Sequence, residues 1–259
     1  MLYGILDGSI KLFPMKIIPY VILFFAIATI NCSCKKHQDN EAIASESAKK
    51  IIVSYSFDGV ALTFDSMLYY NLSGNLLGVS HLEYYVSDIV LTRSNGEQII
   101  INKEFYVDAR KNELNSIDLG TIPDGEYTSI TFYVGLDSSK NQTGFLPPTT
   151  YNINMAWPVG MGGGYHFMKL EGHFVEMGNT YGYAIHLGNN YTLVQCTIHQ
   201  NFNFSNGNTI LKLDMNLSEW FKNPYSYNLN VDPNYTMGDS TAMTNISHNG
   251  TDVFTIKTN

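Results

Sequence analysis

The residues with the clearest chemical potential in this sequence are histidines and methionines that gather between residues 155 and 186. They are Met155, Met161, Met168, His166, His173 and His186. Imidazole and thioether groups are suitable ligands for a soft ion such as Cu(I). Their spacing matches no diagnostic metal motif, and a single histidine or methionine on an apolar face is more often a packed residue. The residue types alone therefore leave open both a copper site and ordinary core packing.

Two of these histidines fall in stretches that we expect to be strands, so alternation along the chain predicts how their side chains are distributed. His166 shares a face with Met168 in the first stretch. His186 shares a face with Ala184 in the second. The three glycines at 162–164 precede the first stretch and predict a bend or a close backbone approach. They do not form a phosphate loop, because no strand-to-helix transition follows them.

No catalytic signature accompanies these residues. The sequence contains no nucleophile elbow, P-loop, zincin helix or CxxC pair, and its acidic residues show no spacing typical of general acid–base catalysis. Cys196 shares one face of a predicted strand with Val194 and Ile198, so we expect it to be a small core residue and not a reactive thiol. We therefore predict that the protein is not an enzyme, and a hydrolase or oxidase is the function ranked last.

The charge balance excludes one class of partner. The 259 residues carry 15 basic and 23 acidic side chains, a net charge of −8, and the arginines are Arg93 and Arg110. Phosphate contacts need a basic face, so we expect no nucleic-acid partner. With only 3 cysteines, the domain must be stabilised by a large core or a bound metal, and not by disulfides.

The N-terminal part of the sequence is typical of a bacterial lipoprotein signal. An apolar run at 17–28 follows Lys16 and is shorter than a helix that spans a bilayer. Residues 29–33 connect this run to Cys34. A small residue, Ser33, precedes Cys34, and two lysines follow it. We therefore predict a signal peptide at 1–33 and acylation of Cys34. Cys32 is the second candidate for acylation, and an uncleaved membrane anchor is the alternative.

The predicted lipid attaches the mature chain to a membrane of the cell envelope. We expect the outer membrane, with the domain facing either the periplasm or the exterior. Met15 is the expected initiator, because the residues before it add no useful basic region. Residues 34–50 are polar and typical of a flexible tether, and residues 51–259 are expected to form a β domain.

Short apolar runs separated by Gly, Asn, Asp and Pro predict that this domain consists of strands and turns. The predicted strands fall near 51–65, 82–93, 97–108, 126–137, 164–176, 180–188, 191–204, 209–217 and 252–257. Helix is scarce: residues 218–221 resemble a capped single turn, and 238–246 a short helix. We therefore predict an all-β fold, either an antiparallel β-sandwich or an irregular barrel with one or two short helices.

An ordered set of segments resembles a known family. The segments are YYVSDIVL (84–91), FYVDA (105–109), IPDGEY (122–127), FYVGLD (132–137), MAW (155–157), GYHFMKLEG (164–172), IHLG (185–188) and NGTDVF (249–254). Together they resemble the MbnP-like domain, which is common in lipoproteins of Bacteroidetes-type bacteria. The resemblance covers essentially all of 51–257. This family is similar to the methanotroph copper proteins MopE, CorA and MbnP.

The resemblance implies a β-sandwich-like fold with a copper site. In the copper proteins, histidines and a tryptophan oxidised to kynurenine hold the ion, and a diheme MauG-like peroxidase is the usual oxidising partner. Carried over by residue, Trp157 is the candidate for the kynurenine, and His186 of the His-Leu-Gly motif is the candidate ligand. Residues 158–159 are Pro-Val where a histidine is expected after the tryptophan. His166 or Met155 is then the expected substitute.

We therefore expect a lipid-anchored cell-envelope protein that binds copper for storage, scavenging or hand-over. This hypothesis predicts that Trp157 and His186 lie together at a site that reaches solvent. The alternative is a non-catalytic surface module that binds a protein or a glycan through exposed aromatic residues. Tyr225, Tyr227 and Tyr235, in a loop rich in Pro and Asn, suit that role. The alternative predicts a contiguous exposed aromatic patch away from the histidines.

Overall fold

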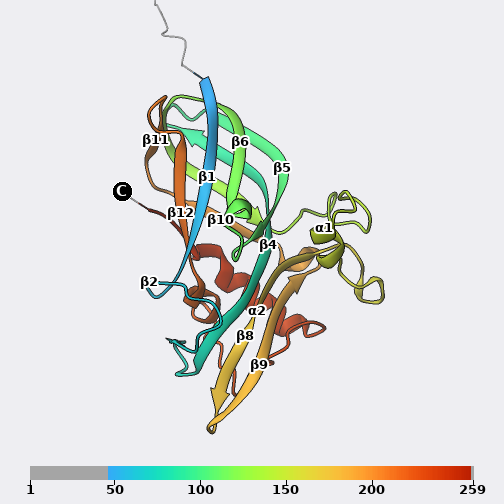
Figure 1. The fold of residues 1–259 in the computed structure, drawn as a ribbon. Helices are drawn as coiled ribbons and strands as arrows, with labels where there is room; N and C mark the ends of the chain where they lie inside the picture. The colour runs from blue at the N-terminus through green and yellow to red at the C-terminus, as the bar shows by residue number, and fades with distance from the viewer. Residues whose placement is uncertain (1–45, 258–259) are drawn as a thin grey trace, which may run out of the picture. The chain divides into compact units, whose positions relative to one another are not determined.

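The computed structural model describes residues 46–257 (Figure 1). The predicted signal peptide at 1–33, the predicted acylation site Cys34 and most of the predicted tether lie outside these residues. Within 46–257, no helix is both long and apolar enough to span a bilayer. The described chain is mainly strand and forms two sheets. The predicted all-β fold is therefore confirmed.

The two sheets differ in size. The first has the order β13–β12–β1–β2, and β6 also pairs with β1. Its strands are β1 (Glu46–Phe57), β2 (Val60–Ala61), β6 (Ser116–Pro123), β12 (Ile210–Asn216) and β13 (Phe254–Ile256). The second has the order β10–β7–β4–β8–β9, with β3 and β5 paired to β4 and β11 paired to β7. Its strands are β3 (Tyr69–Tyr70), β4 (Leu76–Arg93), β5 (Gln98–Asp108), β7 (Gly125–Val134), β8 (His166–Glu176), β9 (Asn179–Gly188), β10 (Val194–Ile198) and β11 (Phe202–Phe204).

Strand β4 connects two regions of the second sheet. Its C-terminal half pairs with β5 and β7, and its N-terminal half pairs with β8. The register shifts between Val79 and His81 and again near Asp88, which adopts a φ of 52°. Such bulges bend a strand and increase its twist. In Figure 1 the β8–β9 hairpin accordingly runs along the N-terminal half of β4, away from β5. This hairpin carries both His166 and His186.

The core lies between the two sheets. Tyr84 of β4 and Phe132 of β7 both contact Phe254 of β13, with ring centroids 6.3 and 5.0 Å apart. Buried aromatic pairs of this kind contribute strongly to core stability. Cys196 of β10 is buried as well, its thiol donates to the carbonyl oxygen of Gly250 at 3.4 Å, and burial raises the pKa of the thiol. The prediction that Cys196 is a core residue is confirmed.

Several strands differ from their predicted bounds. β1 begins at Glu46 and not near 51, because Lys49 is buried in the strand and forms an ion pair with Asp124 at 2.5 Å. β6 is absent from the predicted strands, since its apolar alternation is short and is interrupted by Gly120. The predicted strand at 191–204 is divided into β10 and β11. Finally, β1 and β12 pair in parallel, a direction that alternation within one strand does not reveal.

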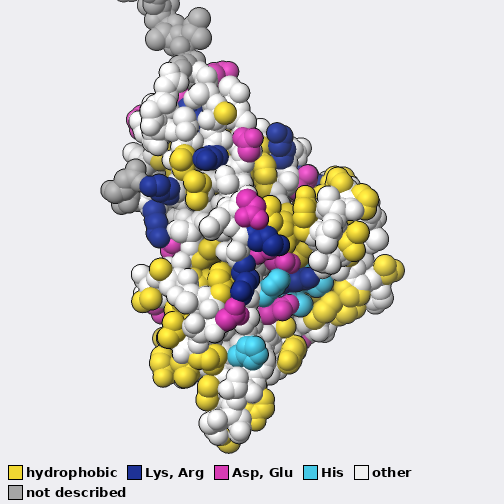
Figure 2. Space-filling model, in the orientation of Figure 1, with side chains coloured by type: hydrophobic (Ala, Val, Ile, Leu, Met, Phe, Trp, Pro, Cys, Tyr) yellow, Lys and Arg dark blue, Asp and Glu magenta, His cyan; other side chains and the backbone are white. Residues whose placement is uncertain are grey.

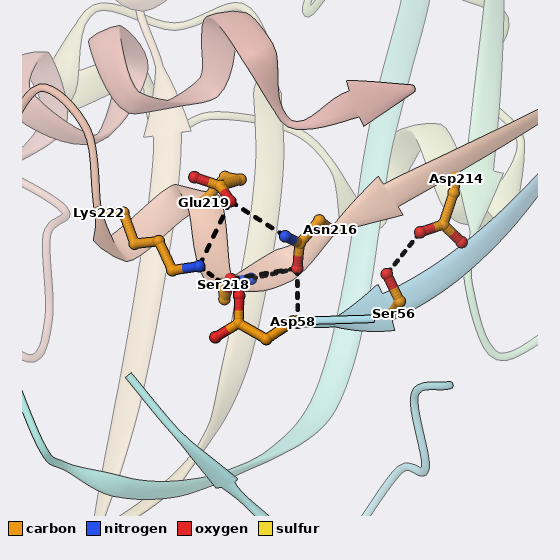
Figure 3. A network of polar contacts seen from close by, with 7 residues as sticks. All are labelled: Ser56, Asp58, Asp214, Asn216, Ser218, Glu219 and Lys222. Atoms are coloured by element: carbon orange, nitrogen blue, oxygen red, sulfur yellow. Dashed lines mark hydrogen bonds and ion pairs between the residues drawn. The ribbon is translucent and has the colours of Figure 1, made fainter. Parts of the chain in front are cut away.

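A polar network lies where the parallel pair of β1 and β12 ends (Figure 3). The backbone N–H of Asp58 donates to the side-chain oxygen of Asn216 at 2.8 Å, and the hydroxyl of Ser218 donates to the carboxylate of Asp58 at 2.5 Å. Lys222 forms ion pairs with both Asp58 and Glu219. These contacts join the ends of two strands that are remote in sequence, so we assign the network a structural role.

Helical residues are few in the described chain. The α-helices are α1 (Thr150–Asn154) and α2 (Ser240–Asn249), and the 3-10 helices are η1 (Asn112–Leu114), η2 (Val159–Met161), η3 (Asn190–Thr192), η4 (Leu217–Phe221) and η5 (Gly250–Asp252). The predicted turn at 218–221 corresponds to η4. The predicted helix at 238–246 corresponds to α2, where Asp239 caps the N-terminus by accepting from the N–H of Ala242 at 2.9 Å. α1 is too short to be predicted from periodicity.

Candidate metal centre

Three separate segments bring an indole and two imidazoles together at the start of β8. Trp157 lies between β7 and β8, His166 is the first residue of β8, and His186 is near the end of β9. The ring centroids of Trp157 and His166 are 4.7 Å apart, and those of His166 and His186 are 5.0 Å apart. His166 therefore lies between the other two rings. Met155, the fourth predicted site residue, contacts His166 through its backbone carbonyl oxygen.

A β-bulge at the start of β8 decides the direction of His166. The register of β8 against β9 shifts between His166 and Met168. Lys169 pairs directly with His186, so these side chains share a face, whereas Met168 is buried in the core. The bulge moves His166 onto the face of His186, as their ring contact shows. The prediction that His166 shares a face with Met168 is therefore wrong, because it assumed unbroken alternation.

Trp157 is held by the site loop, defined here as residues 138–165. The glycines at 162–164 all have positive φ, from 69° to 113°, which confirms the predicted bend. A Cβ atom on Gly164 would collide with the side chain of Asn141, and the N–H of Gly164 donates to the hydroxyl of Thr143 at 2.9 Å. Only glycine allows this close approach of the two ends of the loop.

The indole of Trp157 is almost completely buried, with 1% of its surface exposed. Its N–H donates to the carbonyl oxygen of Met161 at 3.0 Å. Gly188, at the end of β9, lies so close to the ring that a Cβ atom there would collide with it. The ring is therefore fixed on both sides. The indole nitrogen also has no free lone pair, so the unmodified side chain offers no nitrogen ligand.

His166 is buried and neutral. Its Nδ1 lies 3.1 Å from the carbonyl oxygen of Met155, which also accepts from the backbone N–H of His166 at 2.6 Å. Burial, with smaller contributions from Lys169 and His186, lowers the pKa of His166 to about 4. A neutral imidazole is the form that binds a metal ion.

His186 is positioned from both its backbone and its ring. The hydroxyl of Thr236 accepts from the backbone N–H of His186 at 2.8 Å and donates to its carbonyl oxygen at 2.8 Å. Nε2 lies 2.7 Å from the carboxylate of Glu171. The side chain of His186 is 15% exposed, and that of Glu171 is 38% exposed. The site therefore reaches solvent on the side of His186, whereas Trp157 and His166 form its buried wall.

The family model described as MbnP matches residues 47–240, a range that includes the whole candidate site. The chain belongs to the MbnP family. The resemblance predicted from the ordered segments is thereby confirmed. The match starts at residue 47, close to the first residue of β1.

A solved structure supports the same fold for this MbnP-family chain. MbnP from Methylosinus trichosporium is similar to it with a TM-score of 0.54 and 14% sequence identity. The similarity covers 82% of this chain and 98% of that chain. At this identity the likeness concerns the fold alone. No curated protein sequence matches the chain.

The donor set in this MbnP-family site is small. Among residues 46–257, no group of three or more His, Cys, Asp or Glu side chains is arranged to hold a metal ion. His166 and His186 are thus the two imidazoles that the cluster offers, with Trp157 beside them. Zinc sites use three or four protein ligands, and calcium needs several oxygens. Two imidazoles fit a soft ion of low coordination number, such as Cu(I), better than they fit zinc or calcium.

The other histidine and methionines of the 155–186 region lie in three different environments. Met168 is fully buried in the core. Met161 is exposed, and its carbonyl oxygen accepts from the indole N–H of Trp157. His173 is exposed and lies on the same strand as His166 but roughly 20 Å further along it, at about 3.3 Å per residue. The structure therefore separates His173 from the site.

Glu171 and a row of charged side chains around it are not singled out by sequence reasoning. Glu171 contacts His186 and is the cross-strand partner of His81, whose Nε2 lies 3.2 Å from Glu83. Figure 2 shows histidine, acidic and basic side chains gathered together on this face of the molecule. Alternation does place Lys169 and Glu171 on one polar face of β8. Only the pairing with β4 and β9 shows which histidines they meet.

The low pKa of His166 predicts how acid affects the metal-free protein. The unfolded chain binds a proton on this residue with a pKa of 6.5, whereas the folded chain does so near pH 4. The free energy of unfolding therefore decreases as the pH falls from 6.5 toward about 4. Between about pH 7.5 and about pH 5, we expect the free energy of unfolding to fall by about 2 kcal/mol through His166. Urea unfolding at both pH values measures this.

The matched control is His166→Gln, which cannot take up the proton. The contact with Glu83 raises the pKa of His81, so the change in stability with pH that comes from His81 has the opposite sign. This contribution is the same in the wild type and in His166→Gln. The difference between the two proteins therefore isolates His166. Equal losses of stability in the wild type and the variant would contradict the assignment.

Proposed function

We propose that this protein binds a single copper ion, as Cu(I), between His166 and His186, and that it stores, scavenges or hands over the ion without turnover. The observation that supports the proposal most is the convergence of both imidazoles with Trp157. These three rings come from separate segments, and they meet on a partly exposed surface. In this proposal copper is the cargo of the protein.

The chemistry of the donors supports copper over harder ions. The pKa of His166 is lowered by burial, so its ring nitrogen carries a lone pair throughout the physiological range. Glu171 is the carboxylate that contacts His186, whereas calcium or magnesium would need several oxygens. Among residues 46–257, no group of three or more His, Cys, Asp or Glu side chains is arranged to hold a metal ion. The Pro-Val pair at 158–159 lacks a histidine, and His166 occupies the place beside Trp157 instead.

We further propose that Trp157 becomes a third ligand after oxidation to kynurenine. The C2–C3 bond of the indole breaks, and two molecules of hydrogen peroxide each supply one oxygen atom and are reduced to water, which gives N-formylkynurenine. Hydrolysis by one water then releases the formyl carbon as formate and leaves kynurenine. The product has an aromatic amine with a free lone pair, unlike the indole nitrogen. A diheme MauG-like peroxidase is the proposed partner. Met155 lies beside this position and contributes its carbonyl oxygen to His166.

The cellular setting is part of the proposal. We infer that a lipid on Cys34 anchors the domain to the cell envelope, through the signal at 1–33. An extracytoplasmic copper protein that holds its ion needs no catalytic group. Accordingly we propose that the protein is not an enzyme.

The alternative, a surface module that binds through aromatic residues, has less support. Tyr227 is buried, and its hydroxyl donates to the carbonyl oxygen of Pro233 at 2.5 Å. Tyr225 is exposed, and its ring stacks on His248 with ring centroids 5.8 Å apart. Tyr235 is exposed. The three tyrosines of the loop thus have different environments, and they do not all contribute to one exposed patch.

The test is the metal content of the full-length protein purified from its own host, together with the mass of the peptide that contains Trp157. Copper with an oxidised Trp157 supports the whole proposal. Copper with an intact Trp157 supports a site of two histidines. The peptide that contains Trp220, the other tryptophan of the chain, is the internal control and should be unmodified. Absence of copper with an intact Trp157 would overturn the proposal in favour of the surface module.

A further inference from the structure

Each imidazole of the site has one ring nitrogen engaged by a group that only accepts hydrogen bonds. Nδ1 of His166 faces the carbonyl oxygen of Met155 at 3.1 Å, and Nε2 of His186 faces Oε1 of Glu171 at 2.7 Å. A neutral imidazole has a single N–H, and that hydrogen lies on the nitrogen that faces the acceptor. The opposite nitrogen keeps its lone pair, and this is the atom that can bind a metal.

We propose that Glu171 is a positioning residue that selects Nδ1 of His186 as the metal ligand, while the carbonyl of Met155 selects Nε2 of His166. This inference deepens the proposed copper function and rests on it. It identifies the two nitrogen atoms that hold the ion. It also assigns a role to a carboxylate that lies outside the residues predicted from the sequence.

The strand pairing explains why Glu171 reaches the ring of His186. Lys169 is the direct cross-strand partner of His186, so Glu171 occupies the diagonal position on the same face. Diagonal neighbours are within reach of long side chains. Thr236 already holds the backbone of His186 through two hydrogen bonds, which leaves only the ring free to rotate. The hydrogen bond to Glu171 removes that remaining freedom.

Glu171 is suited to this role by its position, because its Oε1 lies 2.7 Å from Nε2 of His186. A carboxylate can accept the N–H of Nε2 but cannot donate to it. Carboxylates behind metal-binding histidines fix the tautomer and make the ligand more basic, and their loss typically reduces metal affinity 10- to 100-fold.

Nitrogen NMR of the full-length chain, labelled with ¹⁵N in its histidines, tests the assignment atom by atom. In the metal-free protein at about pH 8, where free imidazole is neutral, we expect His186 to carry its hydrogen on Nε2 and His166 on Nδ1. Cu(I) is diamagnetic, so the same spectrum can be followed during its addition. The signals of Nδ1 of His186 and Nε2 of His166 should then shift as ligands.

Two variants of Glu171 separate positioning from simple structural support. Glu171→Ala should give mixed tautomers of His186 in the metal-free protein and weaken Cu(I) binding about 10- to 100-fold. Glu171→Gln keeps an oxygen that accepts a hydrogen bond but has no charge. We expect this variant to show the wild-type tautomer of His186 and much of the wild-type affinity for Cu(I). Glu176→Ala, on the same strand but away from His186, is the matched control and should change neither property.

The outcomes are distinguishable. A copper-induced shift at Nε2 of His186 would overturn the ligand assignment while leaving the copper function intact. An unchanged tautomer in Glu171→Ala would overturn the role of Glu171. If Cu(I) shifts no signal of either histidine in the wild-type protein, the proposed function fails and the ligand assignment fails with it.

Discussion

Replacing either His166 or His186 is expected to weaken Cu(I) binding by at least about 100-fold, which is the largest effect that we anticipate in this protein. Loss of a residue that supports a ligand already reduces metal affinity 10- to 100-fold, and loss of a ligand should exceed that. Glu171 contacts His186, but among residues 46–257 no group of three or more His, Cys, Asp or Glu side chains is arranged to hold a metal ion. His166→Gln and His186→Ala are the suitable variants, and competition with a Cu(I) chelator of known affinity measures the change.

His199→Ala is the control for these variants, because His199 is an exposed histidine outside the site. It should bind Cu(I) as the wild type does. His166 is buried, so each variant should first be checked for a native near-ultraviolet circular dichroism spectrum. A folded His186→Ala protein with wild-type affinity for Cu(I) would exclude the proposed site.

The second large effect is expected from Lys140, at the start of the site loop. Its buried ammonium group forms ion pairs with Asp88, with Glu104 at 3.3 Å and with Asp137 at 3.7 Å, and it donates to the side chain of Asn102 at 2.6 Å. Burial lowers the pKa of Lys140, but the carboxylates, Asp88 above all, outweigh this and raise it overall. The lysine is therefore charged, and it compensates the carboxylates clustered around it.

We expect Lys140→Met to reduce the free energy of unfolding by about 3 kcal/mol. Removing one partner of a buried ion pair leaves an uncompensated charge, which typically costs 3–5 kcal/mol. The lower value applies here, since the carboxylates retain some contact with solvent. Urea unfolding at neutral pH measures the change from the shift of the midpoint at constant slope.

Lys103→Met provides the comparison for Lys140→Met, because Lys103 lies exposed on the neighbouring strand β5. Its replacement should change stability by less than about 0.5 kcal/mol. Similar effects of the two substitutions would show that the carboxylate cluster does not depend on Lys140. The comparison also tests whether the site loop is held to β4 and β5 by this lysine.

Much of the fold could be predicted from the sequence because its signals are local. The alternation of Leu211, Leu213 and Met215 with polar residues predicts β12, and the Asp239 cap marks the start of α2. The three glycines at 162–164 predict the bend of the site loop. Each of these features depends on a few neighbouring residues. No knowledge of the rest of the chain is needed to interpret them.

Features that depend on pairing between distant strands could not be predicted in this way. The parallel direction of β1 and β12 is one example, and the extension of β1 to Glu46 through the buried Lys49 is another. Both are decided by a partner strand that lies far away in the sequence. The same holds for β6, whose short apolar pattern becomes meaningful only beside β1.

In the candidate site, too, some features follow from local sequence and others depend on pairing between distant strands. By itself the sequence determined the residue types, the family resemblance, and the candidates Trp157, His166, His186 and Met155. Only the tertiary structure decided that His166 faces His186, because a single extra residue in a β-bulge reverses the alternation on which the prediction depended. The tertiary structure also brought Glu171 to Nε2 of His186, since cross-strand register, unlike residue type, is a property of two segments together.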